Sequence, residues 1–163
     1  MDDVVAKAGV AKGAIYHHFA SKEALFTRVL ESIQEELASA QVPAADRKLR
    51  DPLDQIAGGV LRYLLAATGP GRRRILLVDG PAVLGWRKWR EIDDRHFGAA
   101  ARMAVTAALG EGAAAAEIEA VTHLLLGAVM EAALVCATAK DPKKSAREQS
   151  AALRKMLEGL RTK

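Results

Sequence analysis

The chain has 163 residues and a net charge of +4, and 50% of its residues are hydrophobic although only 4% are aromatic. With 27% charged residues this composition excludes a disordered chain, and no run of about 18 apolar residues avoids charge, so we expect no membrane span. The acidic start Met1-Asp2-Asp3 is unlike a signal peptide, and the lone Cys136 cannot form an intrachain disulfide, which fits a cytoplasmic protein.

Helical spacing of apolar residues runs along the whole sequence, and no segment alternates with a period of two, so the fold class is all-α. Two short helices are expected over residues 2–8 and 12–18, joined at Gly9, where a tight turn needs positive φ. Ser21 is a good N-cap for a third helix, which Pro43 closes. The apolar positions of that helix recur every four residues, at Leu25, Val29, Ile33 and Leu37.

The second half of the chain contains longer helices with clear start and stop signals. Asp51-Pro52 and Asp141-Pro142 each place an N-cap before a proline at the first helical position. A short apolar segment over residues 72–79 is expected to end at Gly80-Pro81, and a long helix follows from Trp86 to Leu109. Residues 117–139 are almost wholly apolar, which predicts a helix buried on most sides.

The second short helix has the chemistry of a DNA-reading element. Its exposed side is expected to carry Lys12, Gly13, Ala14, Tyr16, His17 and His18. Small residues at its start let a helix approach base edges, and Lys, Tyr and His side chains donate hydrogen bonds to phosphates.

The amino-acid sequence of this region matches a long and specific pattern. The pattern Gly-Val-x-Lys-Gly-x-x-Tyr-x-His-Phe-x-Ser-Lys-Glu-x-Leu, which starts at Gly9, resembles the TetR family of bacterial transcription repressors. The resemblance implies that residues 11–17 form the recognition helix. It implies further that Lys12, Gly13 and Ala14 face bases and that Tyr16, His18 and Lys22 hold phosphates, while His17 is equally well explained as a contact or as exposed surface.

The sequence departs from that family at its start. A full helix normally precedes the position of Met1, and Ala11 stands where a capping Ser is common. We therefore expect the natural chain to begin upstream.

Two groups of residues in the second half are candidates for a ligand site. Trp89, Asp93 and Phe97 repeat at i, i+4 and i+8, either as core anchors or as the aromatic wall of a pocket. His123 and Glu131 share one face of the apolar 117–139 helix, where His123 is expected to be a hydrogen-bonded core residue. A buried Glu131 would need a ligand, a charge on another helix or a partner chain. No histidine has metal-ligand spacing, so we expect neither a metal nor a cofactor.

The resemblance also implies a homodimer in which the last two helices pack against their symmetry mates. Residues 117–139 and 142–161 fit that role, with a seam of Leu153, Leu157 and Leu160. Two-fold symmetry would place two recognition helices on one face of a palindromic double-stranded operator.

The sequence therefore predicts a helix-turn-helix region with its connecting helix over residues 1–41, and a helical ligand-binding and dimerisation domain over residues 42–163. The predicted function is a dimeric repressor released from operator DNA by a small-molecule effector. The alternative is an all-α dimeric partner- or ligand-binding protein whose DNA reader is incomplete. An enzyme using His96, His123 or Glu131 is disfavoured, because the sequence lacks a nucleophile elbow and a phosphate loop.

Overall fold

The computed structural model describes residues 6, 7, 9, 11–41, 51–69, 71–110 and 112–159. These residues are almost entirely helical and contain no strand, which confirms the all-α expectation. The helices in chain order are α2 (Lys12–His18), α3 (Lys22–Gln41), α4 (Pro52–Ala67), α5 (Arg72–Arg74), the π-helical turn η2 (Ile75–Asp79), α6 (Gly80–Leu84), α7 (Trp86–Leu109), α8 (Ala115–Thr138) and α9 (Pro142–Glu158).

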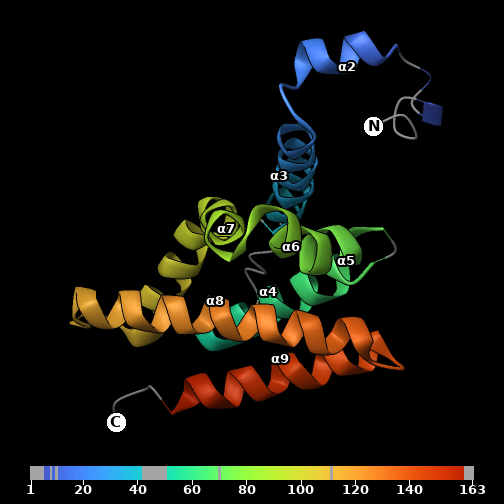
Figure 1. The fold of residues 1–163 in the computed structure, drawn as a ribbon. Coiled ribbons are helices and arrows are strands. Elements are labelled where there is room, and N and C mark those ends of the chain that lie inside the picture. Colours follow the sequence, from blue (N-terminus) through green and yellow to red (C-terminus); the bar gives the residue numbers. More distant parts are fainter. Residues whose placement is uncertain are drawn as a thin grey trace.

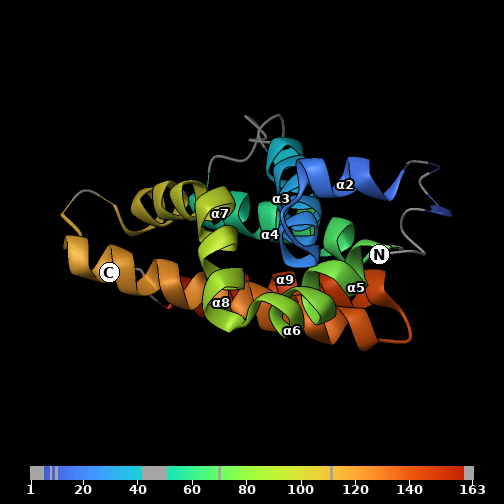
Figure 2. The ribbon, with the colours of Figure 1, turned by 45° about the horizontal axis from the view of Figure 1, so that its top comes forward.

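The short helix α2 stands at one end of the molecule, and the antiparallel pair α8 and α9 crosses the opposite end (Figure 1). Between them α3 runs from α2 into the body, where it contacts α4, α6 and α7 (Figures 1 and 2). The long helix α3 is therefore the physical connection between α2 and the rest of the protein.

Three helix starts agree with their predicted caps. Ser21 Oγ accepts a hydrogen bond from the Ala24 N–H at 3.0 Å. The Asp51 carboxylate accepts from the Leu53 N–H at 2.9 Å, and that of Asp141 accepts from the Lys144 N–H at 3.0 Å. Each bond satisfies an amide that has no partner inside its own helix, so local chemistry fixes where these helices begin.

The buried face of α3 differs from the predicted row. Leu30, Gln34 and Leu37 are buried, whereas Val29, expected in the core, is exposed. A row of every fourth residue drifts around a helix of 3.6 residues per turn, so the true stripe combines steps of three and four. The polar Gln34 thus occupies a core position.

The expected break at Gly80-Pro81 is wrong. The helix continues through both residues and ends at Gly85, whose φ is 75°. The Gly80 N–H donates to the carbonyl of Ile75, five residues earlier. This wider π turn carries the chain past Pro81, whose ring would clash in a regular α-helical turn.

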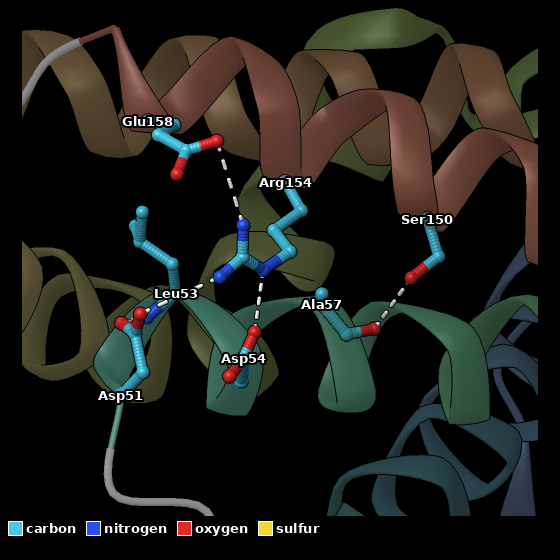
Figure 3. Close-up of polar contacts among 7 residues, drawn as sticks. All are labelled: Asp51, Leu53, Asp54, Ala57, Ser150, Arg154 and Glu158. Atoms are coloured by element: carbon cyan, nitrogen blue, oxygen red, sulfur yellow. Dashed lines mark hydrogen bonds and ion pairs between the residues drawn. The ribbon is translucent and has the colours of Figure 1, made fainter.

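Helix α9 is fastened to α4 by buried leucines and by one polar cluster (Figure 3). Arg154 reaches Asp54, Asp51 at 3.4 Å and Glu158 at 3.5 Å, and the Ser150 hydroxyl donates to the Ala57 carbonyl at 2.8 Å.

The predicted dimer seam on α9 needs correction. Leu153 and Leu157 are buried inside the chain, on the side of α9 that packs against α4, and are not available to a second copy. Leu160 lies outside the described residues.

The expectation that the 117–139 helix is buried on most sides is also wrong. One side of α8 packs against α4, α7 and α9, but Leu124, Leu134 and Val135 are exposed on the other. By length and apolar content α8 is the one helix in the described ranges that would be able to cross a membrane, a property that core helices of soluble proteins share. The uncovered side of α8 is thus an exposed apolar surface in the described part of the chain.

Candidate DNA-reading helix and ligand cavity

The α2 helix presents its polar side chains to solvent. Tyr16 is 44% exposed, and Gly13, Ala14, His17 and His18 are exposed as well. Lys22, at the start of α3, is also exposed, whereas the side chain of Lys12 lies outside what the structure describes. Gly9 has a φ of 66°, as the predicted turn requires. The candidate DNA-reading residues whose side chains are described are thus free of internal packing roles.

The α2 helix lacks a side-chain cap at its start. Ala11 occupies the N-cap position and makes no capping hydrogen bond. At the other end the Phe19 N–H donates to the Ile15 carbonyl at 2.8 Å, and both side chains are half-buried. This hydrogen bond closes the last turn of α2.

Three ion pairs tie α3 to the body along its length. Glu23 contacts Lys88 at 2.7 Å and Glu31 contacts Arg95 at 2.9 Å, both on α7. Glu36 contacts Arg72 of α5 at 2.7 Å. Exposed pairs of this kind are worth about 0–1 kcal/mol each, so they orient α3 more than they stabilise the fold.

A cavity of about 280 Å³ lies between α4, α7 and α8, with the last residue of α3 at its edge. Most of its wall is apolar. The lining residues are Gln41, Gln55, Ile56, Gly59, Val60, Arg62, Tyr63, Asp93, Phe97, Ala100, Ala101, Ala104, Leu125, Leu126, Val129 and Met130. Its mostly apolar wall with a few polar groups is typical of a small-molecule site.

Asp93 is the buried charge in this wall. The residue is 5% exposed, and its Oδ1 accepts a hydrogen bond from Gln34 Nε2 at 3.4 Å. Burial raises the pKa of Asp93 to about 6, against the opposing effects of the Arg90 charge and the Gln34 hydrogen bond. Burial also raises the pKa of Tyr63 far above its ordinary value, with the Asp93 charge adding to the effect.

Two further polar side chains of the cavity are incompletely satisfied. Gln41 Oε1 and Arg62 Nε are buried and have no hydrogen-bond partner among the described residues. Both groups border Gly59, since an added Cβ there would lie 3.9 Å from Gln41 Oε1 and 3.8 Å from Arg62 Nη2. The absence of a side chain at Gly59 leaves space beside them.

The structure brings two of the five predicted ligand residues into the cavity. Asp93 and Phe97 line it, and the Phe97 ring packs edge-on against Tyr63 with centroids 5.3 Å apart. Trp89 does not line it, because this residue is fully buried and its Nε1–H donates to the Leu76 carbonyl at 3.0 Å. Trp89 is therefore a core anchor and not part of the pocket wall, which were the two interpretations of the sequence.

His123 and Glu131 lie away from the cavity. Both are exposed, so the expectations of a core histidine and a buried glutamate are wrong for the single chain. They share the outer face of α8 with Leu124, whereas Leu125, Leu126 and Val129 face the cavity. Sequence alone did not distinguish these two faces because both are rich in apolar residues.

Sequence reasoning missed the polar residues that α3 and α4 place in the cavity wall or beside Asp93, namely Gln34, Gln41, Gln55, Arg62 and Tyr63. Only Gln34 left a usable signal, as a polar residue within the apolar stripe that contains Leu30 and Leu37. The placement of the others depends on the packing of distant segments.

Comparison with known proteins gives consistent matches along the chain. The family model described as "Bacterial regulatory proteins, tetR family" matches residues 1–29. That described as "Tetracyclin repressor-like, C-terminal domain" matches residues 53–160. The crystal structure of a TetR-family transcriptional regulator from Pectobacterium atrosepticum is 30% identical with a TM-score of 0.71, covering 100% of this chain and 83% of that one. No curated protein matches the sequence.

Proposed function

The chain belongs to the TetR family of bacterial regulatory proteins, and from this premise we propose that it is a cytoplasmic transcriptional repressor. It binds operator DNA as a homodimer and leaves the operator when a small molecule fills the cavity. Residues 1–41 are the DNA-reading part, and residues 42–163 form the regulatory and dimerisation part.

The exposed side of α2 is the observation that carries DNA binding. Tyr16, His17, His18 and Lys22 offer hydrogen-bond donors at the end of the molecule opposite α8 and α9 (Figure 1). Gly13 and Ala14 add no bulk at the start of the helix, where close approach to base edges is needed. Figure 1 shows α2 standing apart from the helices α4 to α9, and these side chains are exposed, so the surface is available to a duplex.

The uncovered face of α8 supports dimerisation. Leu124 is 73% exposed and lies one turn from Gly127, whose missing side chain permits close approach of another helix. Leu134 and Glu131 continue the same face, and Met156 adds an exposed apolar side chain on α9. This replaces the predicted leucine seam with the outer face of α8 and the outward residues of α9.

The hydrogen bond from Gln34 to Asp93 supports ligand control. Asp93 belongs to the wall of the cavity, whereas Gln34 belongs to α3, which carries α2 at its start. Gln41, the last residue of α3, also borders the cavity. A ligand that favours one position of α3 over another changes the affinity for DNA by the same factor by which DNA changes the affinity for the ligand.

Selection from a random duplex library tests the DNA-binding proposal. The recovered sequence is expected to be an inverted repeat whose half-sites lie about 34–36 Å apart or a multiple of that distance. Fluorescence anisotropy should then show tighter binding to this duplex than to a shuffled duplex of equal composition. The logarithm of the association constant should fall linearly with the logarithm of the salt concentration between about 50 and about 200 mM. A library without enrichment, together with salt-independent binding, would favour the partner-binding alternative.

A further inference from the structure

The charges around Asp93 are unbalanced. Arg90 of α7 forms an ion pair with Asp94 at 3.2 Å and is also the cation that acts on Asp93. One positive charge therefore balances two carboxylates. The Gln34 hydrogen bond, at 3.4 Å, is long for a bond to a charged acceptor. We propose that the cavity takes a small apolar amine, whose ammonium group pairs with the Asp93 carboxylate. This inference rests on the proposed function, because it takes the cavity to be the effector site.

Among the residues that the structure describes, the other walls of the cavity offer Asp93 no compensating cation. From α3 the polar residues are the uncharged Gln34 and Gln41, and the α8 residues of the cavity are all apolar. From α4 the titratable groups are Tyr63, which stays neutral, and Arg62. Arg62 is not among the charges that shift the pKa of Asp93.

Arg62 raises the opposite possibility, an anionic ligand. Its Nε has no acceptor in the described part of the chain, but its side chain is only partly buried and reaches water. Asp93 is 95% buried by contrast, and a carboxylate cut off from water costs far more than one unpaired N–H of a solvated guanidinium. The carboxylate is therefore the group that gains most from a ligand of opposite charge.

The rest of the cavity suits an apolar body. Ala100, Ala101 and Ala104 line the cavity from α7, and Leu125 and Val129 line it from α8. A volume of about 280 Å³ is at the lower end of ligand pockets, so the ligand is small.

Pairing with an amine has a direct regulatory consequence. The ammonium shares the carboxylate with Gln34 Nε2, and Gln34 is the buried polar link between α3 and α7. Amine binding therefore changes the charge balance at the contact between α7 and α3.

Isothermal titration calorimetry on the full chain without DNA tests the amine. The probes are 3-phenylpropylammonium, the neutral 3-phenylpropanol and the anionic 3-phenylpropanoate, which have similar size and shape. The ammonium is expected to bind at least about tenfold more tightly than either of the others at pH 7.5. Asp93→Asn should abolish this preference, whereas Glu91→Gln, which removes an exposed carboxylate from the same helix, should keep it.

Proton release provides a second readout. Near pH 6 the ammonium should displace roughly half a proton from wild-type Asp93, measured as a dependence of the binding enthalpy on the buffer, and none from Asp93→Asn. Equal affinity for the three probes, tighter binding of the propanoate, binding of none, or an unchanged preference in Asp93→Asn would overturn the proposal. Because no DNA is present, any of these results leaves the proposed repressor function standing, and failure to bind DNA leaves the amine site standing.

Discussion

Trp89 lies so close to Gly80 that a Cβ on Gly80 would sit 2.7 Å from the Trp89 Cδ1 atom. The indole is fully buried, and its outer neighbour Trp86 stacks on it with ring centroids 5.2 Å apart. The same hypothetical Cβ would be 2.9 Å from the carbonyl oxygen of Ile75 in the π turn. Gly80 is therefore a position at which the backbone of α6 and the Trp89 ring lie too close for any side chain.

We expect Gly80→Ala to destabilise the protein by about 1–3 kcal/mol, because backbone and a rigid ring leave the methyl group no room. The free energy of unfolding in urea, at one fixed protein concentration, measures the effect. Gly98→Ala is the matched control, since its Cβ would meet nothing closer than 3.9 Å in the middle of α7. That variant should be more stable than wild type by roughly 0.5–1 kcal/mol. Equal stability of the two variants would contradict this account of Gly80.

We expect Asp93→Asn to stabilise the protein at neutral pH and not in acid. The pKa of Asp93 is raised from 3.8 to about 6, so the folded protein binds this proton more tightly than the unfolded chain does. Wild-type stability should therefore decrease as the pH rises from about 4 to about 6 and lose nothing more from this group above that range. The variant avoids this loss, which amounts to about 3 kcal/mol.

Unfolding free energies of both proteins at about pH 4.5 and pH 7.5 check this prediction, and the difference should be much larger at the higher pH. The Asn side chain keeps an oxygen that accepts from Gln34, so the change removes the charge and little else. Glu91→Gln, which changes an exposed carboxylate on the same helix, is the matched control and should alter the free energy of unfolding by less than about 0.5 kcal/mol. A stabilisation independent of pH would mean that packing, and not the buried charge, is responsible.

We expect Leu124→Arg to dissociate the proposed dimer, because a charge would be buried in the face that α8 presents to its partner. The dissociation constant should rise at least about tenfold, measured by sedimentation equilibrium. Met103→Arg is a close control, since Met103 is 74% exposed and Leu124 73%, but Met103 lies on α7. A wild-type chain that sediments as a monomer, or equal dissociation in both variants, would remove α8 as the interface.

The sequence predicted the helices well where one residue's chemistry decides the structure. Ser21, Asp51 and Asp141 each cap the helix that follows them, and the cap depends on a neighbour two or three residues away. Prediction failed where a helix has apolar residues on all sides. In α8, Leu124 is exposed and Leu125 is buried. Which of the two faces the core depends on how α4, α7 and α9 pack, and no local pattern encodes that packing.

The cavity was predictable only in part for the same reason. Asp93 and Phe97 share one helix, so their spacing already placed them on one face. Gln34 meets Asp93 across 59 positions of sequence, and Arg62 and Tyr63 come from a third helix. Contacts of that separation follow from the packing of whole helices, and a row of residues on one helix does not reveal them.

Substitutions in the DNA-reading region should affect the salt dependence of DNA binding only where they remove a charge. Lys22→Gln removes a cation near the proposed phosphate contacts, so the affinity for the selected operator should fall several-fold and the slope of log K against log salt should become shallower by about 1. Tyr16→Phe removes only a hydroxyl, so we expect the affinity to fall about fivefold to tenfold with the slope unchanged.

Lys140→Gln, in the exposed connection between α8 and α9, is the control, because it removes the same charge far from α2 and should change neither the affinity nor the slope. Anisotropy titrations at four salt concentrations measure both the affinity and the slope for each variant. Equal effects of Lys22→Gln and Lys140→Gln would show that the overall positive charge, and not a contact beside α2, attracts the duplex.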